Sequence, residues 1–203
     1  MVCAMQKRIS RKQPRPAPTD QRVSRADWIR HGLAVLAEEG IDAVRVEPLA
    51  VRLGVTKGSF YWHFADRATL HAAMLESWRQ RATRNIAART SAIAAGPKQQ
   101  LHHLLSLIAT SGAAARLETA IRSWASADTK AARLVAEVDK ERTEFVVNLL
   151  VSVGIARPTA QLRARMMYLL LIGSYFSHSR GQVLATRELW DEVERLVLLD
   201  LEG

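Results

Sequence analysis

One short stretch of the chain concentrates side chains that can donate hydrogen bonds to phosphate oxygens. Hydroxyl, ammonium, imidazole, indole and guanidinium groups are all hydrogen-bond donors, and their aromatic rings can also pack against sugars. Within twelve positions these donors are Thr56, Lys57, Ser59, Tyr61, Trp62, His63 and Arg67. Their types and close spacing favour contact with a nucleic-acid backbone, provided that one surface presents them together.

The same stretch is unusually aromatic for this chain, which has four Phe, three Tyr and five Trp in all. Four of these residues fall within positions 60 to 64. A helix-turn-helix needs a small residue where its helices cross, a glycine in the turn and an apolar residue to fill the angle. Ala50, Gly54 and Phe60 meet these needs. Phe64 follows Phe60 by one turn, so we expect both phenylalanines to be buried.

The other two aromatics, Tyr61 and Trp62, are expected to project outward together with Ser59 and His63. The second helix of a helix-turn-helix is the one that enters the major groove of DNA. These side chains are therefore candidates for DNA contact, with Thr56, Lys57 and Arg67 at the edges. The alternative is that Tyr61 and Trp62 only cover the surface of the small domain.

Helical periodicity runs through the chain after residue 23, with no alternating strand pattern and no internal repeat, which predicts an all-α fold of about nine helices. Ser24 and Asp27 have the spacing of a capping box, and Gly40 ends the first helix. Further helices are expected at 46–53, from 57 or 58 for about seven residues, at 67–89, in three segments between 97 and 153, at 158–180 and at 186–201.

The charge distribution points to a polyanionic partner, either nucleic acid or an acidic membrane surface. The net charge is +9, with an isoelectric point near 10.4. Residues 1–23 are basic, proline-containing and without apolar periodicity, which predicts a disordered arm; a transit peptide is the alternative. The lone cysteine, Cys3, and the short apolar runs favour a soluble cytoplasmic protein without a membrane span.

The segment "LAVRLGVTKGSFYWHFADRATL", residues 49–70, resembles the DNA-binding domain of the TetR (tetracycline repressor) family of bacterial transcription regulators. The residues that carry the resemblance are Gly54, Val55, Lys57, Gly58, Tyr61, His63, Phe64 and Leu70. It implies a helix-turn-helix DNA-binding domain at 24–66, with Gly58 among the contact residues. It also implies a larger helical domain at 67–203 that binds a small effector and dimerises through its last two helices.

Two positions depart from the family pattern. Arg45 stands where the family often has Thr or Ser, and Arg67 where it often has Lys. Both side chains can still contact phosphate, so both remain candidate DNA-binding residues. The helix at 158–180 is apolar nearly all round, which independently favours a homodimer through residues 158–201.

Apolar stripes in the larger domain are candidates for an effector pocket with few polar groups. The segments 120–128 and 138–142 also resemble a pattern found in the effector domains of one family subgroup. The candidate lining residues are Met74, Trp78, His103, Leu104, Ile108, Arg122, Trp124, Phe145, Met166 and Leu170, with Glu141 as a further polar group. The alternative is that these stripes are ordinary core, in which Met commonly fills gaps.

No triad, paired-carboxylate site or phosphate loop is evident, so we expect neither an enzyme nor a cofactor. Adjacent His102 and His103 point about 100° apart on a helix and do not form a metal pair. The leading hypothesis is a dimeric repressor that binds a palindromic operator and is released by a small molecule. The alternatives are an all-helical enzyme or carrier for an acidic small molecule, and an architectural DNA-binding protein without a ligand.

Overall fold

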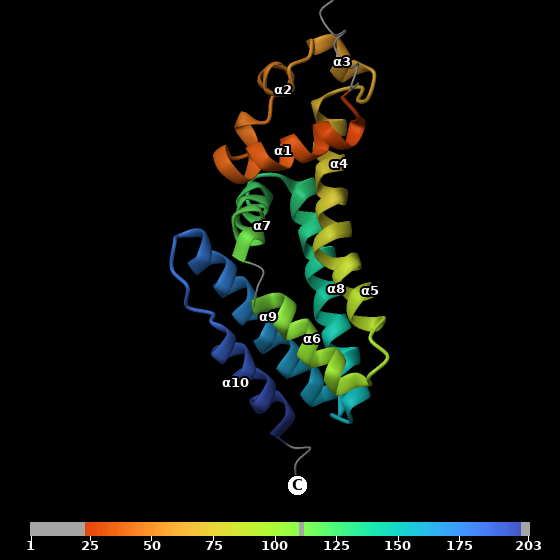
Figure 1. The fold of residues 1–203 in the computed structure, drawn as a ribbon, viewed down its shortest axis with the longest axis vertical. Coiled ribbons are helices and arrows are strands. Elements are labelled where there is room, and N and C mark those ends of the chain that lie inside the picture. The colour runs from red at the N-terminus through yellow and green to blue at the C-terminus, as the bar shows by residue number, and fades with distance from the viewer. Residues whose placement is uncertain (1–22, 110–111, 200–203) are drawn as a thin grey trace, which may run out of the picture.

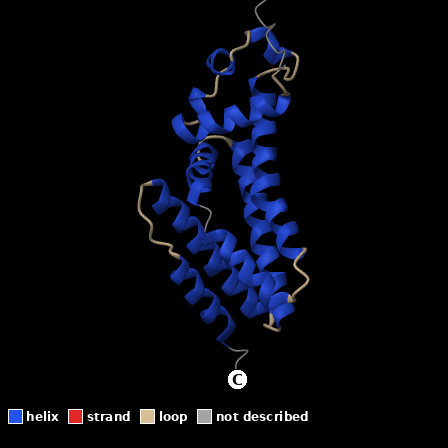
Figure 2. Cartoon of the chain, in the orientation of Figure 1, coloured by secondary structure: helices blue, strands red, loops and turns tan. Residues whose placement is uncertain are grey.

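A computed structural model describes residues 23–109 and 112–199, and it confirms the all-α prediction, since no strand occurs in these ranges. The predicted arm at 1–23 lies almost wholly outside the described residues. Figures 1 and 2 show an elongated stack of helices with α1–α3 at one end. The helices are α1 (Arg25–Glu39), α2 (Val46–Leu53), α3 (Lys57–Tyr61), α4 (Arg67–Arg79), α5 (Asn85–Ser91), α6 (Pro97–Ala109), α7 (Gly112–Ala125), α8 (Thr129–Val153), α9 (Arg157–Ser179) and α10 (Arg187–Leu198), with a 3₁₀ turn η1 (Ile41–Ala43) and a π-helical turn η2 (Gln80–Arg84).

Local signals set the boundaries of the first helices. The Ser24 hydroxyl accepts a hydrogen bond from the Asp27 amide, and the Asp27 carboxylate accepts from the Ser24 amide, so the predicted capping box is confirmed. Gly54 ends α2 with a φ of +68°, a left-handed conformation that favours glycine. The third helix is shorter than expected, because it spans five residues instead of about seven.

The long helix predicted at 67–89 is interrupted. It runs as α4, then widens into the π-helical turn η2, and continues as α5 to Ser91. The widened turn holds the buried Thr83, whose hydroxyl accepts a hydrogen bond from Arg142 on α8 at 3.1 Å. A π-helical turn commonly marks a functional site. The periodicity of apolar residues in the sequence does not reveal such a turn.

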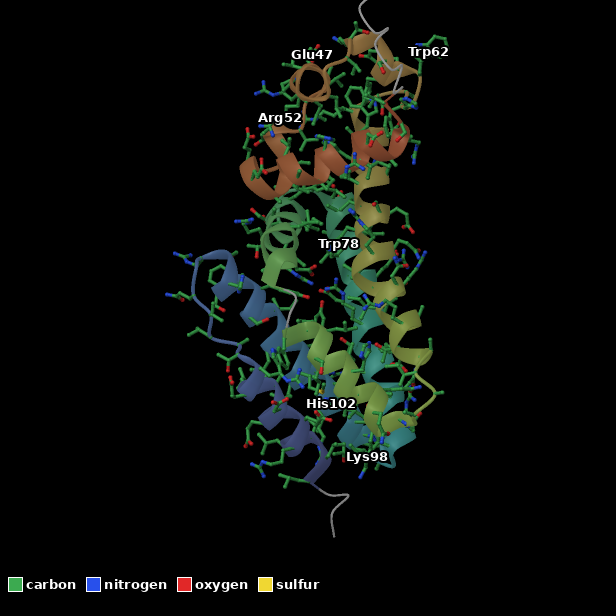
Figure 3. The ribbon with its side chains drawn as sticks, viewed as in Figure 1. Glu47, Arg52, Trp62, Trp78, Lys98 and His102 are labelled. Carbon is green, nitrogen blue, oxygen red and sulfur yellow. The ribbon has the colours of Figure 1, made fainter. Side chains whose placement is uncertain are left out.

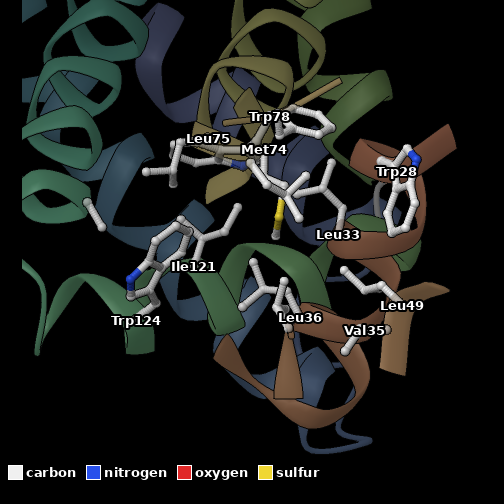
Figure 4. Packing of buried hydrophobic residues seen from close by; sticks show 14 of the residues in the cluster. Trp28, Leu33, Val35, Leu36, Leu49, Met74, Leu75, Trp78, Ile121 and Trp124 are labelled. Atoms are coloured by element: carbon white, nitrogen blue, oxygen red, sulfur yellow. The ribbon is translucent and has the colours of Figure 1, made fainter. Parts of the chain in front are cut away.

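Two apolar clusters form the interior. The first joins α1–α4 to α7 and α8, with Trp28, Met74, Trp78 and Trp124 among its buried residues (Figure 4). It crosses the predicted domain boundary at residue 66. The second cluster packs α6 against α8, α9 and α10 and includes the buried Trp190.

The last two helices match the predicted ranges closely, as α9 at Arg157–Ser179 and α10 at Arg187–Leu198. Large apolar side chains stay exposed on both: Leu162, Met166, Leu169, Leu170, Phe176, Leu189 and Leu196.

The described residues contain no single helix of the length and apolar character that crossing a membrane requires. One bent pair, Pro97–Ala109 with Ala114–Ala125, satisfies that test by length and composition only.

Candidate functional site

The inner face of α3 anchors this short helix to the three-helix unit at residues 24–66, called the head below. Phe60 is fully buried, and Phe64 is 2 % exposed. The Phe60 ring meets Trp28 edge to face and stacks on Phe64, with 5.3 Å between ring centroids in both pairs. Aromatic pairs at this separation add to the energy of burial. The predicted burial of the two phenylalanines is therefore confirmed.

The outer face of α3, together with the residue that directly follows this helix, carries the other two aromatics. Trp62 is 88 % exposed and Tyr61 is 54 % exposed. In Figure 3, Trp62 projects from the head at the end of the molecule. Ser59 is half-buried between the two faces. An isolated indole this exposed leaves both its apolar ring and its N–H free for a partner surface, so the DNA contacts predicted for Ser59, Tyr61 and Trp62 have the access that they need.

His63 does not project outward, so that expectation is wrong. Its Nε2 lies 2.9 Å from the carbonyl oxygen of Val23, just before α1. This contact ties the end of α3 to the start of α1. A DNA contact through His63 stays a prediction, and it would have to use the remaining exposed part of a half-buried ring.

Arg67, at the start of α4, makes contacts within the head and beside it. Its Nη2 donates to the carbonyl oxygen of Ile41 at 3.0 Å, and its Nε donates to Nε2 of His71 at 3.2 Å. The His71 ring meets Trp124 of α7 edge to face at 5.1 Å. Burial and the Arg67 guanidinium lower the pKa of His71. Arg67 therefore links the head to the larger part of the chain. Its contact with DNA stays a prediction.

Lys57 forms an exposed ion pair with Glu47 of α2. Its hydrogen bond to Glu47 raises the pKa of the lysine and lowers that of the carboxyl, so both groups are charged at neutral pH. The ammonium group stays accessible, and Glu47 lies at the solvent-facing edge of α2 in Figure 3. A phosphate that binds Lys57 must therefore compete with the Glu47 carboxylate.

Three further predicted DNA-binding residues, Arg45, Thr56 and Gly58, are exposed. Arg45 and Thr56 directly precede α2 and α3, and neither side chain makes a capping hydrogen bond. A Cβ atom placed at Gly58 would meet only the Thr56 hydroxyl, at 3.6 Å, which is ordinary contact. No close approach of another described helix therefore requires glycine at this position, and the surface outside Gly58 is open to a partner.

A cavity of about 280 Å³ lies in the second cluster, bounded by η2, α5, α6, α8, α9 and α10. Of the predicted pocket residues it includes Leu104, Ile108 and Phe145. Residues that the sequence did not suggest complete the wall: Ala82, Thr83, Arg84, Ile86, Ala87, Arg142, Val146, Ala164, Met167, Tyr168, Leu171, Tyr175 and Trp190. Glu141, which was expected as a polar group, is also at the wall.

The remaining pocket candidates do not line this cavity. Met74, Trp78 and Trp124 are buried in the first cluster, where they fill the junction between α1, α4 and α7 (Figure 4). Met166 and Leu170 point outward from α9, with 63 % and 41 % of their surfaces exposed. His103 is half-buried on α6 outside the lining, and Arg122 belongs to an ion network beside the cavity.

That network centres on Glu118 of α7, which is 2 % exposed. Its carboxylate accepts hydrogen bonds from Arg142 at 2.7 Å, from Arg122 at 3.1 Å and from the Trp78 indole at 2.9 Å. Burial opposes ionisation of Glu118, but the two guanidinium groups outweigh it and hold the pKa of the carboxyl below its ordinary value. A buried carboxylate without these partners would strongly destabilise the fold.

The network continues to a second carboxylate. Arg122 donates to Asp139 at 2.7 Å and to the Tyr168 hydroxyl at 2.8 Å, and that hydroxyl also donates to Asp139. Burial raises the pKa of Tyr168, so the phenol stays protonated. Sequence reasoning had placed Arg122 in the pocket and had missed Glu118, Asp139 and Tyr168. The i, i+4 spacing of Glu118 and Arg122 was a usable signal.

No group of three or more His, Cys, Asp or Glu side chains suited to a metal ion occurs within the ranges that the structure describes.

Comparison with known proteins gives matches of two kinds. Residues 29–74 match the family described as bacterial regulatory proteins, tetR family. The transcriptional regulator AcuR of Cereibacter sphaeroides is 37 % identical over 68 residues, a match that spans 34 % of this chain and 31 % of AcuR. The chain therefore spans about a third of the length of that relative.

Solved structures resemble almost the whole chain. A transcriptional regulator from Rhodococcus sp. RHA1 has a TM-score of 0.70 at 19 % identity, over 89 % of this chain and 97 % of the other. A TetR-like transcriptional regulator from the same organism has a TM-score of 0.68 at 17 % identity, over 90 % of this chain and 98 % of the other. At these identities the likeness shows a common fold.

Proposed function

We propose that this chain, whose N-terminal domain is that of the tetR family of bacterial regulatory proteins, is a ligand-responsive transcriptional regulator. In this proposal a homodimer represses transcription by binding a palindromic operator, and a small molecule in the cavity releases it. One observation carries the proposal. A continuous helical segment, α4–η2–α5, called the rod below, starts directly after the head at Arg67 and lines the cavity with Ile86 and Ala87.

The DNA step rests on the outer face of α3. Trp62 and Tyr61 face outward while Phe60 and Phe64 hold the helix from behind. Lying in the major groove, α3 would present Ser59 and Trp62 to base edges, with Lys57 and Tyr61 directed to phosphates. The net charge of +9 would favour the approach to DNA.

The dimer rests on the exposed apolar side chains of α9 and α10. Leu162, Met166 and Leu169 recur at helical intervals on one side of α9, with 61 %, 63 % and 72 % of their surfaces exposed. A contiguous apolar surface of this kind marks an interaction site. Two copies of α9 and α10 would bury it in a four-helix interface with twofold symmetry.

The release step rests on the rod. A ligand that displaces η2 and α5 would move α4 and with it the head. A dimer that reads one face of DNA needs its recognition helices about 34–36 Å apart, so a small shift in each head misplaces them. Tenfold weaker DNA binding requires that the ligand favour the non-binding state by about 1.4 kcal/mol.

Fluorescence anisotropy with DNA that flanks the protein's own coding sequence would test the proposal. The expected result is sequence-specific binding by a dimer, weakened by at least one compound from a metabolite library. Thermal shift measurements run beside it distinguish the alternatives. A compound that binds without affecting DNA indicates a carrier or an enzyme, and DNA binding with no ligand at all indicates an architectural protein.

A further inference from the structure

The cavity wall has an apolar part and a polar end. Apolar side chains from five helices make up most of the lining: Ile86, Leu104, Ile108, Phe145, Val146, Met167, Leu171 and Trp190. The polar end is formed by Thr83 of η2, Arg142 of α8 and Tyr168 of α9. A ligand in this cavity would therefore lie mainly against hydrocarbon and meet polar groups at one end.

The Arg142 guanidinium is almost fully engaged by the protein. Its Nε donates to Thr83 at 3.1 Å, its Nη1 to Glu118 at 2.7 Å, and its Nη2 to Glu118 at 3.3 Å and to the Ala82 carbonyl oxygen at 3.4 Å. An arginine has five N–H groups, so these contacts leave one N–H on Nη1. That group can donate a single hydrogen bond to a ligand.

The charges behind the polar end cancel. Two carboxylates, Glu118 and Asp139, face two guanidinium groups, Arg122 and Arg142, in one connected network. Glu118 is buried and cannot turn to solvent if a ligand anion takes its partner. A ligand carboxylate would thus add a third negative charge to two positive ones, and a ligand ammonium group would add a third positive charge to two negative ones, so either ion would be buried without a counter-charge.

The other two charged side chains of the lining are also paired. Arg84 donates to Glu76 at 3.1 Å, and Glu141 accepts from Arg79. Neither offers an unpaired charge to a ligand.

We infer that the cavity binds an uncharged, mainly apolar molecule that places one hydrogen-bond acceptor against Arg142 and Thr83. A volume of about 280 Å³ holds roughly nine to ten non-hydrogen atoms, if each takes about the 30 Å³ of a water molecule in the liquid. The inference rests on the proposed function only in taking this cavity as the effector site. The acidic small molecule of the enzyme or carrier hypothesis does not suit it.

Three probes of one length and different charge test the inference: octan-1-ol, octanoate and octylammonium. Isothermal titration of each into the full chain at neutral pH, without DNA, measures binding directly. We expect octan-1-ol to bind about tenfold or more tightly than either ion. Equal or tighter binding of octanoate or octylammonium would overturn the inference, and so would the failure of all three probes to bind.

Two pairs of variants test whether Glu118 causes the charge preference and whether the probes bind inside the cavity. Glu118→Gln keeps the shape and removes one negative charge, so octanoate should gain about tenfold in affinity, whereas the exposed control Glu137→Gln should leave it unchanged. Ala87→Leu fills the cavity and should weaken octan-1-ol binding about tenfold or more, while its exposed neighbour Ala88→Leu should not. Unchanged octanoate affinity in a folded Glu118→Gln protein, or unchanged octan-1-ol affinity in Ala87→Leu, would overturn the assignment.

A separate DNA titration separates this inference from the proposed function. If octan-1-ol binds the cavity and leaves DNA affinity unchanged, the ligand class stands and the proposed release step fails.

Discussion

The Phe60→Ala variant should unfold its head at a much lower denaturant concentration than the wild type, whereas a variant with the adjacent substitution, Tyr61→Ala, should not. Phe60 is fully buried between Trp28 and Phe64, so its removal leaves a cavity that the surrounding rings can close only in part. Substitutions of this kind cost about 3–5 kcal/mol. The loss of three aromatic contacts, with Trp28, Tyr61 and Phe64, each contributing about 0.5–1.5 kcal/mol, places Phe60→Ala in the upper half of that range.

Tyr61 is the matched control, because it is the next residue on the same five-residue helix and 54 % of its surface is exposed. Its one edge-to-face contact with Phe60 limits the expected loss to about 1 kcal/mol. Urea unfolding followed by circular dichroism and by tryptophan fluorescence gives both free energies of unfolding. Losses of similar size for the two variants would refute the division of this helix into a core face and a contact face.

Three further predictions follow from other contacts. Lys57→Ala should lower the slope of log DNA affinity against log salt concentration by about one unit for each head. Glu47→Gln should raise the affinity for DNA of any sequence, because it removes the carboxylate that competes with phosphate for Lys57. If salt titrations show neither change, Lys57 does not contact phosphate. Leu169→Glu, on the exposed side of α9, should give a monomer in light scattering at micromolar concentration, and a persistent dimer would place the interface elsewhere. Burial lowers the pKa of His71 from its ordinary value of 6.5, so the unfolded chain binds more protons than the folded chain below that pH. The free energy of unfolding, measured by urea unfolding, should therefore fall as the pH drops below about 6.5, and His71→Gln should flatten this part of the pH profile. An unchanged profile would show that His71 does not contribute.

The head was predictable from the sequence because its determinants are local. The capping box at Ser24, the left-handed glycine at Gly54 and the one-turn spacing of Phe60 and Phe64 each act over a few residues. Their positions in the chain therefore define the helix ends and the buried face directly.

The cavity was only partly predictable, because its wall depends on how distant helices pack. Leu104 and Phe145 line it as expected, but Met166 has the same apolar character and points to solvent. Helical spacing shows that one face of a helix is apolar, but it does not show which other helix packs against that face. The ion network is equally non-local, since Glu118 meets Arg142 across 24 positions.

Two errors came from contacts that spacing does not encode. His63 turns to the carbonyl oxygen of Val23, 40 positions earlier, and the π-helical turn η2 shifts the register between α4 and α5. The first depends on how the end of α3 packs against the start of α1, and the second on how η2 packs against α8.

Selection of binding sites from a pool of random DNA duplexes, with the full chain as bait, tests the DNA-binding role of α3 most directly. We expect an enriched inverted repeat with half-sites about one helical turn apart, bound by a dimer. We also expect Trp62→Ala to change or abolish the enriched sequence, while the protein remains folded because this side chain is 88 % exposed. A pool without enrichment, or the same repeat selected by wild type and Trp62→Ala, would contradict the role assigned to the outer face of α3.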